Sequence, residues 1–134
     1  MKKLLAFVLL LIGILFFTSC LDRKFVKGKV EIISVTDTTL NDSSIIVGHV
    51  YRLQDSNTNR GPIQNAKIWI ENSTLSNTSN TTGYYYIKIT PEIYTIKCQD
   101  NGSPWPQLIE EIKNISINKN KKIEINFYLG YAIE

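Results

Sequence analysis

The chain contains few of the residues that build most reactive centres. Its two cysteines are Cys20 and Cys98, and its one histidine is His49. No group of Cys, His, Asp and Glu has the spacing of a zinc site, and there is no glycine-rich loop for phosphate. Adjacent carboxylates such as Glu110-Glu111 are typical of exposed strands. We therefore predict a protein that is not an enzyme and that uses no metal or cofactor.

A charge excess of one sign is also missing. The chain has 15 basic and 12 acidic residues, and loss of Lys2 and Lys3 with the N-terminal segment leaves 13 against 12. Such a balance provides no strong attraction to phosphates. Nucleic acid is therefore not an expected partner.

Long apolar runs are absent except at the N-terminus, where Leu4 to Phe17 follow two lysines. This run is shorter than the roughly 20 residues that a membrane-spanning helix needs. A basic start, a short apolar run and small residues before a cleavage point are typical of a signal peptide. Phe17-Thr18-Ser19-Cys20 resembles the lipobox of bacterial lipoproteins, with Phe17 where leucine is usual. An uncleaved anchor and an ordinary secretory signal are the two alternatives.

The lipobox resemblance implies cleavage before Cys20 and attachment of acyl chains, such as palmitate, to this cysteine. Several chains hold a protein at a membrane far more firmly than a single chain does. We divide the sequence into a signal peptide over 1–19, a lipidated tether over 20–25 and one domain over 26–134. We expect the protein in the bacterial cell envelope, anchored to the outer membrane.

The remaining sequence alternates apolar and polar residues, which predicts β-strands. Turn-forming Asn, Ser, Thr, Gly and Pro separate the strands. The segment 108–117 fits either a helix or a strand, and its β-branched residues favour a strand. The other predicted strands cover 26–32, 46–51, 66–71, 85–89, 94–98 and 123–129. We therefore predict an all-β fold, an antiparallel Greek-key sandwich of about seven strands.

Four motifs within residues 44–98 add a family resemblance. They are Ile46-x-Gly48-x-Val50, Pro62-Ile63-x-Asn65-Ala66-x-Ile68-x-Ile70, Ser79-Asn80-x-x-Gly83-x-Tyr85-x-Ile87-x-Ile89 and Tyr94-x-Ile96. Together they resemble the carboxypeptidase regulatory-like domain, a prealbumin (transthyretin)-like β-sandwich. The resemblance implies a module that is not itself catalytic. Asn80 stands where such domains usually carry aspartate, which argues against calcium at this turn.

Exposed aromatic residues are the candidate ligand-binding groups. By alternation Trp69, Tyr84, Tyr86 and Tyr128 point outward, and Trp105 lies between two prolines in a loop. We select Trp69, Tyr84, Tyr86 and Trp105 as possible ligand-binding residues, because exposed rings stack on sugars or anchor a protein partner. A second layer of internal packing is the structural alternative.

These observations favour an interaction or structural module of the cell envelope, with an envelope protein as its partner. A carbohydrate-binding module that uses the exposed aromatic residues is the alternative function. Cys98 alternates in phase with Tyr94 and Ile96, so we expect a buried thiol. We expect loops 72–80 and 99–106 to point away from the lipid.

Overall fold

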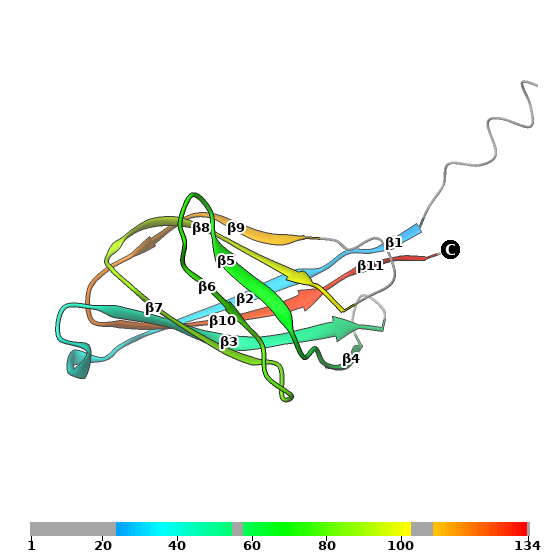
Figure 1. Cartoon of the computed structure of the whole chain (residues 1–134), viewed down its shortest axis with the longest axis horizontal. Helices are drawn as coiled ribbons and strands as arrows, with labels where there is room; N and C mark the ends of the chain where they lie inside the picture. Colours follow the sequence, from blue (N-terminus) through cyan, green and yellow to red (C-terminus); the bar gives the residue numbers. More distant parts are fainter. Residues whose placement is uncertain (1–23, 55–57, 103–108, 134) are drawn as a thin grey trace, which may run out of the picture.

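Alternating side chains form strands throughout the computed structural model, which describes residues 24–54, 58–102 and 109–133 (Figure 1). One short 3-10 helix, η1 (Thr38–Leu40), follows the N-cap Asp37. The strands of the described residues are β1 (Lys24–Val26), β2 (Lys29–Thr36), β3 (Ser44–Leu53), β4 (Asn59–Pro62), β5 (Ala66–Ile70), β6 (Ser76–Thr78), β7 (Tyr84–Ile89), β8 (Glu92–Asp100), β9 (Glu110–Ile117), β10 (Lys121–Leu129) and β11 (Tyr131–Ile133).

The strands form two sheets that face each other. The five-stranded sheet has the order β2-β10-β3, and β7 and β4 pair with different parts of the remaining edge of β3. The four-stranded sheet has the order β6-β5-β8-β9. All pairs are antiparallel except β10 with β3, which run parallel. The last long strand is therefore inserted between the first two.

Apolar side chains from both sheets fill the space between them. The core includes Tyr85, whose ring packs 6.2 Å from that of Phe127, centroid to centroid. The other buried members are Ile46, Val50, Ile63, Ala66, Ile68, Ile70, Ile87, Ile89, Ile96, Cys98, Ile117, Ile123, Ile125 and Leu129. Burial of this apolar surface is the main stabilising contribution to the fold.

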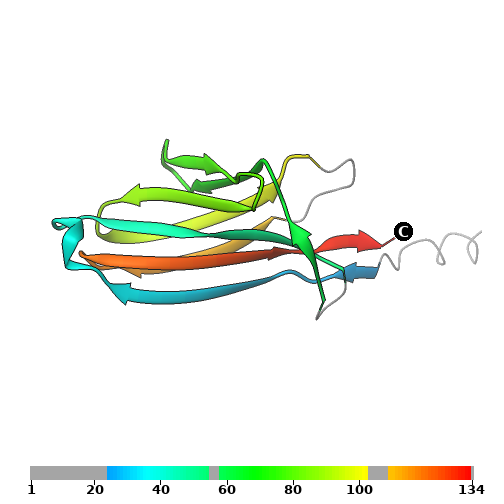
Figure 2. The same ribbon diagram turned by 90° about the horizontal axis from the view of Figure 1, so that it is seen from below.

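The two ends of the described chain lie together beyond one end of the sandwich. Strands β1 and β11 pair in the register that β2 and β10 already have, so they extend the same ladder (Figures 1 and 2). Asp100 lies at this end, because it is ion-paired with Arg52 near the end of β3. The opposite end carries η1 and the turn after β7, because Ile89 pairs with Ser44.

The predicted all-β sandwich is confirmed, and its seven predicted strands correspond to the long strands β2, β3, β5, β7, β8, β9 and β10. Residues 110–117 form a strand. The first strand differs from the prediction, because it begins at Lys24 and is interrupted at residues 27 and 28. Ile32 alternates in phase with Val30, which packs against the core, but Ile32 is 48% exposed, since β2 is an edge strand that the opposing sheet does not cover along its whole length.

The parallel pairing of β10 with β3 is interrupted at Gly48 and His49, where side chains supply hydrogen bonds to the backbone. Asn126 Oδ1 accepts a hydrogen bond from the His49 backbone N–H at 2.9 Å. The buried Tyr85 hydroxyl donates to the Ile125 carbonyl at 2.8 Å. A Cβ on Gly48 would lie 1.8 Å from this same carbonyl oxygen, so only glycine fits there. Burial raises the pKa of Tyr85 well above its ordinary value.

Tyr85→Phe should lower the free energy of unfolding by about 1–2 kcal/mol, because the Ile125 carbonyl loses its partner in a buried site. Urea unfolding followed by circular dichroism measures the change. Tyr86→Phe removes a hydroxyl from an exposed ring on the same strand and should alter stability by less than about 0.5 kcal/mol. Equal effects of the two substitutions would contradict the role assigned to the Tyr85 hydroxyl.

Candidate functional site

Four rings form a continuous aromatic row on the outer face of the five-stranded sheet. Tyr84 of β7 pairs directly with His49 of β3, and Tyr51 of β3 pairs directly with Tyr128 of β10. His49 and Tyr51 lie two residues apart on one strand, so alternation places them on the same face. We call Tyr84, His49, Tyr51 and Tyr128 the aromatic row.

The rings of the aromatic row contact one another in sequence. The Tyr84 and His49 centroids are 5.5 Å apart with planes at 62°, an edge-to-face contact. His49 and Tyr51 stack at 5.9 Å and 19°, and Tyr51 and Tyr128 stack at 5.3 Å and 23°. Stacked neighbours of this kind turn their ring faces toward each other and leave edges and hydroxyl groups for solvent or a partner.

Charged residues of β2 complete the row at the sheet edge. Lys29 Nζ lies 4.6 Å from the Tyr128 ring centroid, a cation–π contact. The Tyr128 hydroxyl donates to Glu31 Oε2 at 2.9 Å. Partial burial and this hydrogen bond raise the pKa of Tyr128 to about 12. The Tyr128 phenol therefore stays protonated over a wide pH range, and the hydrogen bond to Glu31 fixes its position.

The same outer face carries exposed aliphatic and aromatic groups beside the row. Ile33 and Val35 of β2 are 54% and 56% exposed. Tyr84 and Tyr86 of β7 are 38% and 41% exposed. This mixture of apolar surface and tyrosine hydroxyls is typical of protein interaction surfaces.

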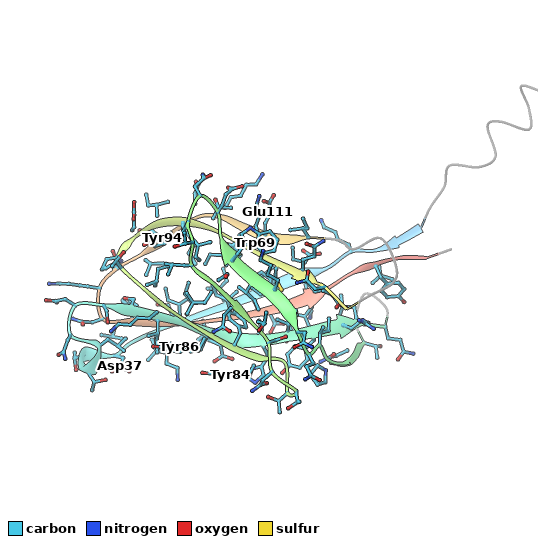
Figure 3. All side chains as sticks on the ribbon, viewed as in Figure 1. Asp37, Trp69, Tyr84, Tyr86, Tyr94 and Glu111 are labelled. Carbon is cyan, nitrogen blue, oxygen red and sulfur yellow. The ribbon has the colours of Figure 1, made fainter. Side chains whose placement is uncertain are left out.

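The four residues selected from sequence do not form one surface. Tyr84 and Tyr86 point outward from β7, as predicted, whereas Trp69 points outward from β5 in the other sheet (Figure 3). Trp69 is half-buried, and Lys67 Nζ lies 5.5 Å from its ring centroid. Trp105 lies outside the described residues. Trp69 and the two tyrosines therefore lie on different sheets, and their role in ligand binding stays a prediction.

Sequence reasoning missed Tyr51 and His49 as members of the row. Alternation already places His49 and Tyr51 on the same face of β3. It does not reveal the strand pairing that brings Tyr128 beside Tyr51. That contact depends on the parallel insertion of β10 next to β3. Short alternating strands do not specify their neighbours, so the row becomes visible only in the fold.

A separate hollow of about 340 Å³ lies at the β1–β11 end of the sandwich. Its polar lining is built around the ion pair between Arg52 and the buried carboxylate of Asp100. Asp100 Oδ1 also accepts the Gly102 backbone N–H at 2.9 Å. Because this carboxylate is fully engaged within the chain, the hollow is best explained as a structural feature.

Cys98 is buried on β8, as predicted, whereas His49 lies on the outer face of the other sheet. Burial, together with nearby Glu110 and Asp100, raises the pKa of the Cys98 thiol. Among the described residues, no group of three or more Cys, His, Asp and Glu is arranged to hold a metal ion. The same residues contain no helix that is both long and apolar enough to span a membrane.

Comparison with known proteins identifies distant structural neighbours only. No family model matches the chain, and no curated protein matches it. Two crystal structures of a type II cohesin–X-dockerin complex from Acetivibrio cellulolyticus are similar, one an N-terminal and one a C-terminal interface mutant. The identities are 18% and 21%, with TM-scores of 0.46 and 0.47. Each match covers 64% of this chain and 58% of the other chain.

Glu31→Gln should lower the Tyr128 pKa below about 12, because partial burial still raises it but the carboxylate that opposes ionisation of the phenol is gone. The folded protein keeps this proton at pH values where the unfolded chain releases it, so stability falls as pH rises between these values. Tyrosine ¹³Cζ shifts measured against pH give the midpoint. Glu111→Gln, on the other sheet, is the control, and an unchanged midpoint in Glu31→Gln would contradict the hydrogen bond.

Proposed function

We propose that this protein is a non-catalytic lipoprotein of the bacterial cell envelope, and that the outer face of its five-stranded sheet binds a protein partner. The aromatic row is the observation that carries the partner-binding part of the proposal. The N-terminal motif ending in Cys20 carries the anchor. The four-residue resemblance to a lipobox and the start of β1 at Lys24, shortly after Cys20, both support the anchor.

The distance between the acylated cysteine and the sandwich is short. Strand β1 begins at Lys24, four residues after Cys20, and four residues span at most about 14 Å. An anchor on Cys20 would therefore hold the β1–β11 end close to the bilayer. Residues 99–102 lie at this same end, so they would lie near the membrane rather than point away from it as expected from sequence.

The ring geometry favours a protein over a sugar as the ligand. A sugar stacks on the face of an aromatic ring, but Tyr51 covers one face of Tyr128 and Lys29 lies over the ring as well. Tyr51 is itself stacked between His49 and Tyr128. The row offers edges and hydroxyl groups, which suit hydrogen bonding and packing against another protein.

We also propose that this domain is related to carboxypeptidase regulatory-like domains. It is supported by the turn before β7, where Asn80 Oδ1 accepts backbone hydrogen bonds from Thr82 at 2.9 Å and Tyr84 at 3.0 Å. Gly83 follows with φ of 78°, a conformation costly for other residues. These are the residues on which the sequence resemblance depends.

Cys20→Ser should abolish incorporation of labelled fatty acid into the protein in growing bacteria, because the acylated sulfur is removed. Cys98→Ser is the control and should keep the label, since Cys98 is buried in the core. Loss of label only in Cys98→Ser, or no label in the unchanged protein, would contradict the anchor.

A photo-crosslinking side chain at position 84 should capture a specific envelope protein in intact cells, whereas the same group at position 111 on the other sheet should not. Tyr51→Ser should weaken the capture at position 84 by roughly tenfold or more, because interface aromatic residues are often worth over 1 kcal/mol. Equal capture from both positions would contradict the proposed face. Binding to a polysaccharide that resists salt and is lost in Trp69→Ala would instead support the carbohydrate-binding alternative.

A further inference from the structure

Strand β2 is a long sheet edge with a regular backbone. Among the described strands it pairs with β10 alone, and in Figure 2 it is the blue strand at the margin of the sheet. Its eight residues pair with β10 without a register shift. A straight edge of this length presents free backbone donors and acceptors to any further strand.

Strand β9, the edge strand of the other sheet on the same side of the sandwich, is protected in ways that β2 is not. Its pairing with β8 shifts register between Tyr94 and Ile96, and Asn114 has a φ of 54°. Both strands carry exposed charged residues, Glu111 and Lys113 on β9 and Lys29 and Glu31 on β2, so the irregular backbone is what distinguishes β9. Bulges of this kind are a common defence against edge-to-edge pairing.

Strand β2 instead exposes large apolar side chains on both of its faces. Ile33 and Val35 are 54% and 56% exposed on the outer face, and Ile32 is 48% exposed on the inner face. An eight-residue edge with this composition is expected to be covered by another strand.

One hydrogen bond shows which backbone groups of β2 face the free edge. The Asp37 N–H donates to the Asn120 carbonyl at 2.8 Å, which continues the ladder with β10. The backbone N–H and carbonyl groups of successive residues point alternately to the two sides of an antiparallel strand. Those of the odd-numbered residues of β2 therefore point to β10. The N–H and carbonyl groups of Val30, Ile32, Ser34 and Thr36 therefore point outward, toward a new strand.

We propose that β2 pairs with β2 of a second copy of this chain, antiparallel and centred on Ile33. In this register Ile33 lies opposite its own counterpart, and Lys29 lies opposite Asp37 at both ends. Ile32 pairs with Ser34 and Val30 with Thr36, so all four outward-facing residues find partners. The segment after Asp37 leads past the end of β10 toward β3, away from this edge (Figure 2).

A register centred on Ile32 satisfies fewer groups. It places Thr36 opposite Gly28, whose backbone N–H already donates a hydrogen bond to the Glu110 carboxylate. It also places Lys29 opposite Val35 rather than opposite a carboxylate. Both backbone pairing and charge therefore select Ile33 as the centre.

Cysteine crosslinking of the full chain in intact cells tests the proposal. Directly opposite residues in non-hydrogen-bonded pairs lie close enough for a disulfide, so Ile33→Cys should give a disulfide-linked dimer on mild oxidation. Ile93→Cys is the matched control, since Ile93 is 63% exposed but lies on the other sheet. Ile32→Cys should crosslink roughly tenfold less than Ile33→Cys, because diagonal residues are several ångströms farther apart.

Charge exchange tests the register separately. Lys29→Glu and Asp37→Lys should each weaken dimer formation by roughly threefold to thirtyfold, because each change affects two symmetric cross-strand pairs. The double variant should restore it. Absence of a dimer in Ile33→Cys, equal crosslinking in Ile93→Cys, failed restoration, or a disulfide with a different protein would each overturn the proposal. Fatty-acid labelling measures acylation of Cys20 separately, so failure of the dimer and failure of the anchor are distinguishable.

Discussion

The backbone pairing of β10 with both β2 and β3 is the constraint on which the rest of the structure depends. It joins the last long strand to the first two, across nearly the whole described chain. It brings the two ends of that chain together as β1 and β11. It also places Tyr128 beside Tyr51, and leaves β2 at the margin. Contacts of such sequence separation pay a large loop-closure cost, so this insertion should be a late and slow step of folding.

The opening of this ladder at Gly48 shows how the central strands tolerate a local defect. A parallel strand with glycine at this point approaches Ile125 too closely for any side chain. The freed groups are then satisfied by Asn126 and Tyr85 rather than by the neighbouring backbone. Because a buried unpaired carbonyl is costly, the tyrosine at position 85 serves both packing and hydrogen bonding. The two motifs that contain Gly48 and Tyr85 therefore meet at one group, the Ile125 carbonyl.

Alternation was sufficient to predict the strands and most of the core, because burial of one sheet face imposes a period of two. Cys98 was placed inside on that basis, and it is buried. Alternation does not explain the exposure of Ile32, because it reports which side chains share a face but not whether that face is covered. It also grouped Trp69 with Tyr84 and Tyr86, because parity does not reveal which sheet a strand joins. Strand order, and with it every surface that spans several strands, depends on contacts that a single sequence does not display.

A lipid anchor and a free β2 edge impose a joint geometric condition. In an antiparallel β2 pair the two β1 arms leave in opposite directions along the strand axis. Both copies can then reach one bilayer through their short tethers only if β2 lies along the membrane plane. Confinement to a membrane raises the effective concentration of the two edges, so an interaction too weak to form in dilute solution becomes favourable at the surface. An unprotected edge strand is hazardous in a freely diffusing protein, because copies in any orientation can pair with it. For a protein held at a membrane by its first strand, the anchor itself limits the orientations in which such pairing occurs.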